Sequence, residues 1–187
     1  MQEYAQSWDL AFKGGGEHDF VVGLVAARRG SDIYLIDRFK QHASFQDADA
    51  DATHGQALPR SGRILVEDKA NGSAIIDTLK HEIGGIIAVT PEGGKYARAS
   101  ACEPRVEAGN VYLPNPVGPD GRSIPERAWV RDCVEQMAVF PRSEHDEDVD
   151  AFSQLMTKWK HPAMSSQMIR YILSLGHRDG PEPRRIF

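Results

Sequence analysis

The hydrophobic positions in the first 40 residues form short, dense runs typical of strands. Three stretches rich in β-branched and aromatic residues predict strands: AQSWDLAF (5–12), DFVVGLVAARRG (19–30) and SDIYLIDRF (31–39). The last two are joined at RRGSD, where Gly30 suits a tight turn because glycine tolerates positive φ. The pattern therefore predicts an antiparallel hairpin near the amino terminus.

Beyond residue 60 the pattern alternates between strand runs and helical spacing. Further strands are predicted at RILVE (63–67), GIIAVT (85–90) and NVYLP (110–114). Helices are predicted at SAIIDTLKHE (73–82), GKYARASACEPRVEAG (94–109), PERAWVRDCVEQMAVF (125–140) and DVDAFSQLMTKWK (148–160), with weaker patterns at 44–58 and 165–178. This order predicts an α/β fold, a mixed central sheet flanked by helices.

Composition narrows the class of protein. The chain has 187 residues, of which 41% are hydrophobic and 26% charged, as expected for one ordinary globular domain. No run approaches the roughly 18 apolar residues of a membrane span, and the first residues lack the features of a signal peptide. Cys102 and Cys133 lie in no paired motif, so neither a disulfide framework nor a zinc site is indicated. We expect a cytosolic protein.

The negative charge is concentrated in one segment. The net charge is −5, and EHDEDVD (144–150) alone holds five carboxylates. Without these five, the chain has 22 acidic residues, equal to its 22 Lys and Arg. Such a local acidic cluster is either a solvated loop or a cation site, and a nucleic-acid partner is not excluded.

Acidic residues also occur where apolar ones are expected. Asp9 lies within the first predicted strand and Glu67 ends the fourth, while Asp146, Glu147 and Asp150 open the last helix at spacings that share one face. Each has an ordinary explanation: a salt bridge, a solvated strand end, or acid favoured at a helix start. Together they suggest a site for hard divalent cations, which prefer carboxylate oxygens.

The order of these motifs resembles a known family. SWDLAFK around Asp9, LVEDKANG around Glu67, GGKYARA, AGNVYLP and HDEDVDAFSQ run in the order found in the C-terminal nuclease domain of tailed-phage terminase large subunits. These nucleases belong to the ribonuclease H-like superfamily. The resemblance covers about residues 6–156 and implies a ribonuclease H-like mixed central sheet flanked by helices.

The resemblance also implies roles for the acidic residues. Asp9 would contact both of two Mg²⁺ or Mn²⁺ ions, and Glu67 would be a ligand at the end of a central strand. Asp146 and Glu147 match a paired-aspartate motif ahead of Asp150; Glu147 departs from it, since aspartate is usual there. All five are candidate catalytic and metal-binding residues, with the choice among the last three open.

Basic residues are the candidates for phosphate contact. Lys95 and Arg98 match positions that would touch DNA, and Arg105 and Lys13 are expected to border the same cleft. For Lys95 and Arg98 the alternative is a solvated helix face. Lys69, together with Asn71 in the same loop, would support the metal ligands without binding the ions directly.

The implied activity is hydrolysis of double-stranded, concatemeric phage DNA in the cytoplasm of the bacterial host. Implied partners are a terminase ATPase domain, the small terminase subunit and the portal, with no membrane. KGGGEHDF lacks the Lys-Ser/Thr of a phosphate-binding loop, so we expect no ATPase domain here. We expect a nuclease domain at 1–160, with a helix and tail at 161–187 packed on it. The alternatives are a resolvase-type ribonuclease H-like nuclease and a non-catalytic module that docks the motor.

Overall fold

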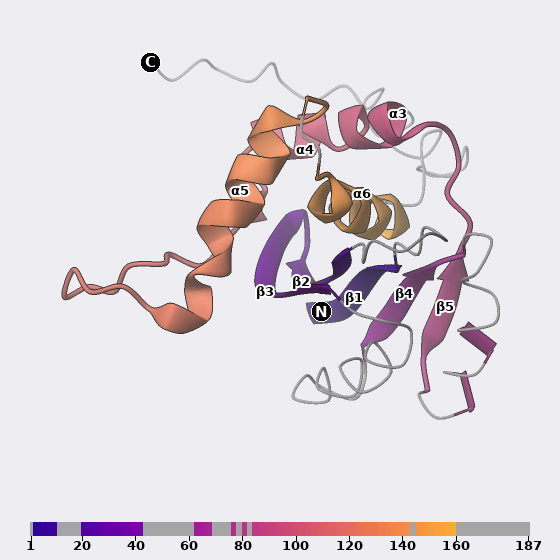
Figure 1. Cartoon of the computed structure of the whole chain (residues 1–187), viewed down its shortest axis with the longest axis horizontal. Helices are drawn as coiled ribbons and strands as arrows, with labels where there is room; N and C mark the ends of the chain where they lie inside the picture. Colours follow the sequence, from indigo (N-terminus) through magenta and orange to yellow (C-terminus); the bar gives the residue numbers. More distant parts are fainter. Residues whose placement is uncertain are drawn as a thin grey trace, which may run out of the picture.

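One mixed sheet forms the centre of the molecule. The computed structural model describes residues 2–10, 20–42, 62–68, 76–77, 80–81, 84–142 and 145–159. Within these residues, six strands lie in the order β5-β4-β1-β2-β3-β6 (Figure 1). Their bounds are β1 Gln2–Leu10, β2 Phe20–Arg29, β3 Asp32–His42, β4 Arg63–Glu67, β5 Ile86–Val89 and β6 Val111–Tyr112.

The strand pairing is antiparallel at the start of the chain and parallel afterwards. β1, β2 and β3 form an antiparallel meander, and Gly30 at φ 63° makes the turn between β2 and β3. β4 runs parallel to β1, β5 parallel to β4, and β6 parallel to β3. The predicted hairpin and the mixed sheet are therefore confirmed.

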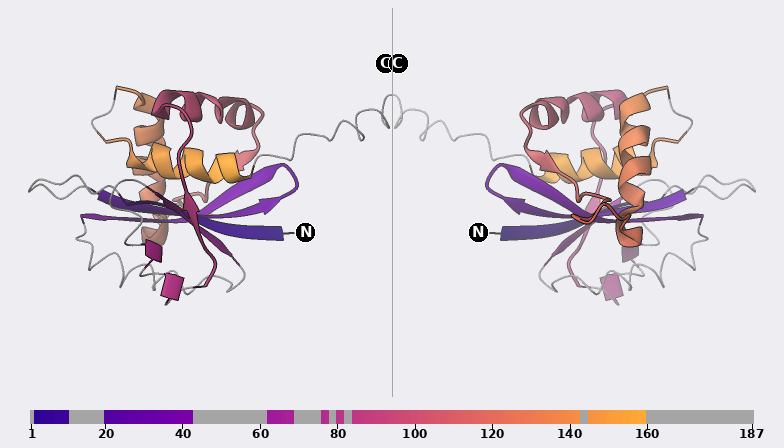
Figure 2. Two further views of the ribbon diagram at one scale, coloured as in Figure 1. Left: turned by 90° about the vertical axis from the view of Figure 1, so that its right-hand side faces the viewer. Right: turned by 90° about the vertical axis from the view of Figure 1, so that its left-hand side faces the viewer.

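Among the residues described, four helices gather on one face of the sheet, whereas helical residues 76–77 contribute Ile76 to the other face. The four helices are α3 Lys95–Ser100, α4 Glu103–Glu107, α5 Trp129–Val139 and α6 Glu147–Lys158, with a short 3-10 turn, η2 Pro125–Arg127. α6 contacts β1, β2 and β4 on one side and α3 and α5 on the other. In Figure 2 it lies between the sheet and the outer helices. Every residue from 148 to 156 is buried, so α6 is the central helix of the domain.

Apolar side chains fill both faces of the sheet. Leu24, Ile33 and Leu65 pack with Leu155 of α6 in the larger cluster. Trp8, Leu10, Val21 and Val66 form the second cluster, together with Ile76. Trp8 belongs to the second cluster, on the face away from α6. Because side chains alternate along a strand, its two neighbours in β1 face α6. Ser7 and Asp9 therefore point toward the helix layer.

Two predicted helices differ from the structure. The helix predicted at 94–109 is two helices, α3 and α4, and Pro104 lies in the first turn of α4. Proline lacks the amide hydrogen that a continuous helix needs, and its ring clashes with the carbonyl four residues earlier. The helix predicted at 125–140 begins as η2 and becomes α5 at Trp129. The strands reproduce the predicted runs to within a few residues.

Other predictions fall wholly or partly outside the described residues. The helices expected at 44–58 and 165–178 lie there, and so does the tail from residue 161, so the division of the chain near residue 160 stays a prediction. Of the helix expected at 73–82, residues 76–77 and 80–81 are described and are helical. In the described part of the chain, no helix is long and apolar enough to cross a membrane.

Candidate metal centre

Asp9 and Glu67 lie at the same end of two neighbouring strands. β1 and β4 are parallel, and Trp8 is in register with Val66. The next residues along the two strands are Asp9 and Glu67, which therefore lie side by side. Leu65 packs against α6, so Glu67, two residues later, faces the same layer. Asp9 is the next-to-last residue of β1, at the strand's end rather than its middle.

The first turn of α6 adds a third carboxylate. Asp9, Glu67 and Asp150 each offer a carboxylate oxygen, and these oxygens lie within 4.8 Å of one another. The three residues are 3%, 5% and 3% exposed. Carboxylates gathered away from water repel one another unless cations lie among them. The donors are all oxygen, the set that Mg²⁺ and Mn²⁺ prefer, so the residues fit a divalent-metal centre.

Gln154 fixes α6 against the two strands that carry these acids. It lies one turn after Asp150, and its amide nitrogen donates hydrogen bonds to Ser7 Oγ at 3.0 Å and to the carbonyl oxygens of Trp8 and Leu65 at 3.3 Å each. Trp8 is the residue before Asp9, and Leu65 lies two residues before Glu67. Gln154 was not singled out from the sequence, although its position four residues after Asp150 in an apolar helix was a usable signal.

Two cations from α3 lie on the acids of α6. Lys95 Nζ is 2.5 Å from Asp146 Oδ1 and 2.6 Å from Asp150 Oδ2. Arg98 Nη2 is 2.6 Å from Asp150 Oδ1. Burial alone would lower the pKa of Lys95, but hydrogen bonds to Asp146 and Asp150 outweigh this effect, and the pKa is raised. Lys95 therefore carries its positive charge beside the site.

A second ionic network holds the start of α6 on the far side from this centre. Asp148 is fully buried, and its Oδ2 is 2.8 Å from Arg38 Nη1 and 3.7 Å from Lys40 Nζ. Arg38 Nη1 also lies 2.6 Å from Asp132 of α5. Burial lowers the pKa of Arg38, but its hydrogen bond to Asp132 and the charge of Asp148 raise it overall. The sequence reasoning did not assign Asp148 or Arg38 a role.

The remaining predicted site residues do not join the cluster of Asp9, Glu67 and Asp150 directly. Glu147 lies 3.5 Å from His145 and 3.9 Å from Lys40, within the second network. Asp146 approaches Asp150 through their shared partner Lys95. Arg105 donates to the carbonyl oxygen of Trp159, at the opposite end of α6 from Asp150. Lys13, Lys69 and Asn71 lie outside the described residues.

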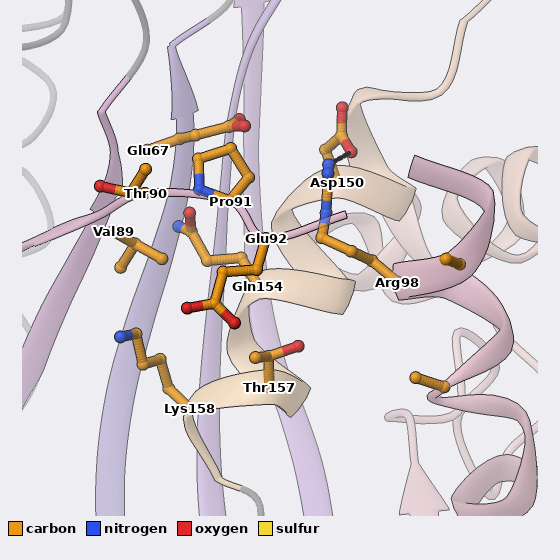
Figure 3. A pocket seen from close by; sticks show the side chains of 12 residues that line it. Glu67, Val89, Thr90, Pro91, Glu92, Arg98, Asp150, Gln154, Thr157 and Lys158 are labelled. Carbon is orange, nitrogen blue, oxygen red and sulfur yellow. Dashed lines mark hydrogen bonds and ion pairs between the residues drawn. The ribbon is translucent and has the colours of Figure 1, made fainter. Parts of the chain in front are cut away.

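A pocket of about 260 Å³ opens beside the acidic centre. Glu67 and Asp150 line one part of it, and Thr157 and Lys158 lie toward the other end (Figure 3). Arg98 and Gln154 form part of the wall between them. Glu67 and Asp150 therefore border a recess that a substrate group could enter from solvent.

Comparison with known proteins places these features in a family. The family described as "Terminase RNaseH-like domain" matches residues 6–158. The nuclease domain of g2p, the large terminase of bacteriophage SPP1, determined with bound Mn, is 15% identical, with a TM-score of 0.51 over 83% of this chain and 86% of that one. The large terminase nuclease of thermophilic phage G20c, with bound zinc, is 15% identical, with a TM-score of 0.60 over 85% and 82%.

A longer protein is also similar in fold. The large terminase of another thermophilic bacteriophage is 8% identical, with a TM-score of 0.59 over 84% of this chain. The chain spans 40% of that protein's length. No curated protein matches the chain significantly. The family match together with these structural similarities confirms the ribonuclease H-like fold.

Proposed function

Because the chain belongs to the terminase RNase H-like domain family, we propose that it is a metal-dependent DNA endonuclease of a phage packaging machine. One observation carries the proposal: three buried carboxylates, from β1, β4 and α6, bring oxygens within 4.8 Å of one another. Burying three carboxylates together lowers the stability of the fold unless cations compensate their charge. A centre for divalent cations requires such a group of carboxylate ligands. The metal-bound SPP1 and G20c nuclease structures support the same assignment.

The residues divide into ligands and supports. We assign Asp9 to two Mg²⁺ or Mn²⁺ ions, Glu67 and Asp150 to one ion each, and Asp146, which is one-third exposed, to a water-mediated or direct contact. We assign no ligand role to Glu147, because its carboxylate lies with His145 and Lys40. Gln154 holds the first turn of α6 at the strand ends, so that the carboxylates meet in a fixed geometry.

The proposed reaction is hydrolysis of a phosphodiester without a covalent enzyme intermediate. Divalent ions held by these carboxylates would acidify a water molecule and would stabilise negative charge on the leaving 3′ oxygen. The protein's own contribution is to orient its carboxylates before the substrate arrives and to present cations to the phosphate. The Arg98 guanidinium is fixed between Asp150 and the carbonyl oxygen of Gly93. We propose that it presents its positive charge to the phosphate.

The substrate we propose is double-stranded DNA, cut with little sequence preference. Family membership supports this substrate, and so do the cations of α3 beside the acids. Cutting of concatemers, and assembly with an ATPase domain, a small subunit and a portal, are proposals that rest on the family alone. Binding through phosphate contacts predicts an affinity that falls steeply as salt is raised.

Nicking of supercoiled plasmid tests the proposal. The purified chain should nick DNA with Mg²⁺ or Mn²⁺ and stop in excess EDTA. Asp9→Asn and Asp150→Asn should lower the rate by more than about a hundredfold, because replacing only an outer partner of a metal ligand already costs about 10- to 100-fold. Asp132→Asn is the control, because Asp132 is 60% exposed and contacts Arg38, away from the three acids. Its nicking rate should match that of the wild type.

Two outcomes would contradict the proposal. One is nicking that persists in EDTA; the other is an Asp9→Asn preparation as active as the wild type, which would point to a contaminating nuclease. Folded wild-type protein that binds metal and leaves plasmid intact would instead favour a docking module. Preferential cutting of four-way junctions over linear duplex would favour a resolvase-type nuclease.

A further inference from the structure

We propose that Lys95 is a displaceable counter-ion that couples metal binding to DNA binding. In this structure its ammonium group contacts Asp146 and Asp150. When divalent ions bind at Asp9, Glu67 and Asp150, Lys95 leaves these carboxylates and pairs with a phosphate of the DNA. The inference rests on the proposed function, because it assumes that the three acids hold metal.

Two cations already contact the carboxylate of Asp150. Its Oδ2 lies 2.6 Å from Lys95 Nζ, and its Oδ1 lies 2.6 Å from Arg98 Nη2. Both oxygens of this proposed ligand therefore already contact a cation from α3. A metal ion that takes Asp150 as a ligand has to share or replace one of these contacts, and two cations on one buried carboxylate repel each other strongly.

The two cations differ in exposure and in their other contacts. The Arg98 side chain is 13% exposed, and its guanidinium also donates to the carbonyl oxygen of Gly93 at 3.1 Å. The Lys95 side chain is 34% exposed and carries a compact charge on a flexible four-carbon stem. Arg98 is therefore fixed at the site, whereas Lys95 can move to solvent or to another anion. Lys95 is the cation that metal displaces.

Metal binding would also change the net charge around the three acids. Asp9, Glu67, Asp146 and Asp150 bring four negative charges to this region, and Lys95 and Arg98 bring two positive ones. Two divalent ions would bring four further positive charges, which leaves an excess. Release of Lys95 lowers that excess, and a DNA phosphate at the metal centre gives its ammonium a new partner. Metal and DNA affinities should therefore raise each other.

The test measures binding rather than cleavage. Lys95→Gln removes the charge, and Lys95→Met also keeps most of the apolar stem should glutamine disturb α3. For each protein, Mn²⁺ affinity is measured by calorimetry without DNA. The affinity for a short duplex is measured by fluorescence anisotropy in EDTA and in Ca²⁺, with the duplex checked for cleavage afterwards. Lys80→Gln is the control, because Lys80 forms an exposed pair with Asp77 outside the acidic centre.

Both Lys95 variants should bind Mn²⁺ about tenfold more tightly than the wild type, because a competitor is gone. The gain in DNA affinity on adding Ca²⁺ should shrink by at least about fivefold, because the phosphate partner released by metal is missing. Lys80→Gln should leave both quantities unchanged.

Unchanged or weaker Mn²⁺ binding in both Lys95 variants would overturn displacement. Tighter Mn²⁺ binding with an undiminished Ca²⁺ effect on DNA affinity would overturn the transfer to phosphate. Either failure leaves the proposed function standing if the wild type binds Mn²⁺ and Asp9→Asn does not. If Asp9→Asn binds Mn²⁺ as well as the wild type does, the proposed metal centre fails, and this inference fails with it.

Discussion

Asp148 and Asp150 show how neighbouring residues of one type take different tasks. They are two positions apart on α6, and both are buried. Asp150 meets Asp9 and Glu67, whereas Asp148 meets Arg38 of β3. Residues two apart on a helix point about 200° apart, so the orientation of α6 decides which acid faces which layer. The sequence alone marked an acidic helix start but did not contain that orientation.

Removing Asp148 should therefore weaken the fold. Asp148→Ala leaves the largely buried Arg38 side chain without its 2.8 Å partner and should lower the free energy of unfolding by about 3–5 kcal/mol. Asp132→Ala removes the exposed partner of the same arginine and should cost no more than about 1 kcal/mol. Urea denaturation in EDTA measures both values without metal. Equal losses for the two variants would show that burial does not distinguish these pairs.

At the scale of elements, a close approach between β1 and β2 determines where Asp9 lies. Trp8 is in register with Gly23, and a Cβ built on Gly23 would lie 2.7 Å from the Trp8 ring. The Trp8 ring therefore packs directly over Gly23. Because Trp8 is the residue before Asp9, this contact helps to set the position of Asp9. The sequence placed this glycine in a strand, but the need for it becomes visible only when the partner strand is known.

Gly23→Ala should disturb both stability and metal binding. The added methyl group forces Trp8 to move, which should cost about 1–3 kcal/mol of unfolding free energy and shift the end of β1. Mn²⁺ affinity should fall in the same variant. Gly84→Ala is the control, because no atom lies within 4 Å of a Cβ there and the residue lacks a positive φ. Its stability should be unchanged or slightly higher. A Gly23→Ala protein with unaltered stability and Mn²⁺ affinity would contradict the account.

The sequence predicted individual helices and strands better than their exact ends and their pairing with one another. Dense apolar runs placed the strands because side-chain periodicity is local. The prediction of one face for Asp146, Glu147 and Asp150 assumed a helix through all three, but Asp146 is the N-cap, with φ of −142°. Helical spacing does not apply to that residue. The parallel register of β1 and β4, which sets Asp9 beside Glu67, is a non-local pairing that no local pattern encodes.

For the whole molecule, the fold gathers distant acids at one end of a sheet. Asp9, Glu67 and Asp150 come from β1, β4 and α6, which are separated in the chain by long segments. The resemblance to terminase nucleases named Asp9 and Glu67 and left the choice among Asp146, Glu147 and Asp150 open; it could link these segments because it carries non-local information that periodicity lacks. The net charge of −5 includes these carboxylates and the neighbouring Asp146 and Asp148, so it is compatible with a DNA-binding protein. The sequence predicted that Lys95 and Arg98 border the cleft, but it did not predict their ion pairs with Asp146 and Asp150.

If Asp9, Glu67 and Asp150 hold divalent metal, a crystal structure with Mn²⁺ should locate the ion among them. Crystals of the wild-type chain grown with Mn²⁺ would be measured near the manganese absorption edge for anomalous scattering. We expect anomalous density among Asp9, Glu67 and Asp150, in contact with oxygens from all three. Density confined to other acids, or none at this centre with Mn²⁺ at a saturating concentration, would contradict the proposed metal centre.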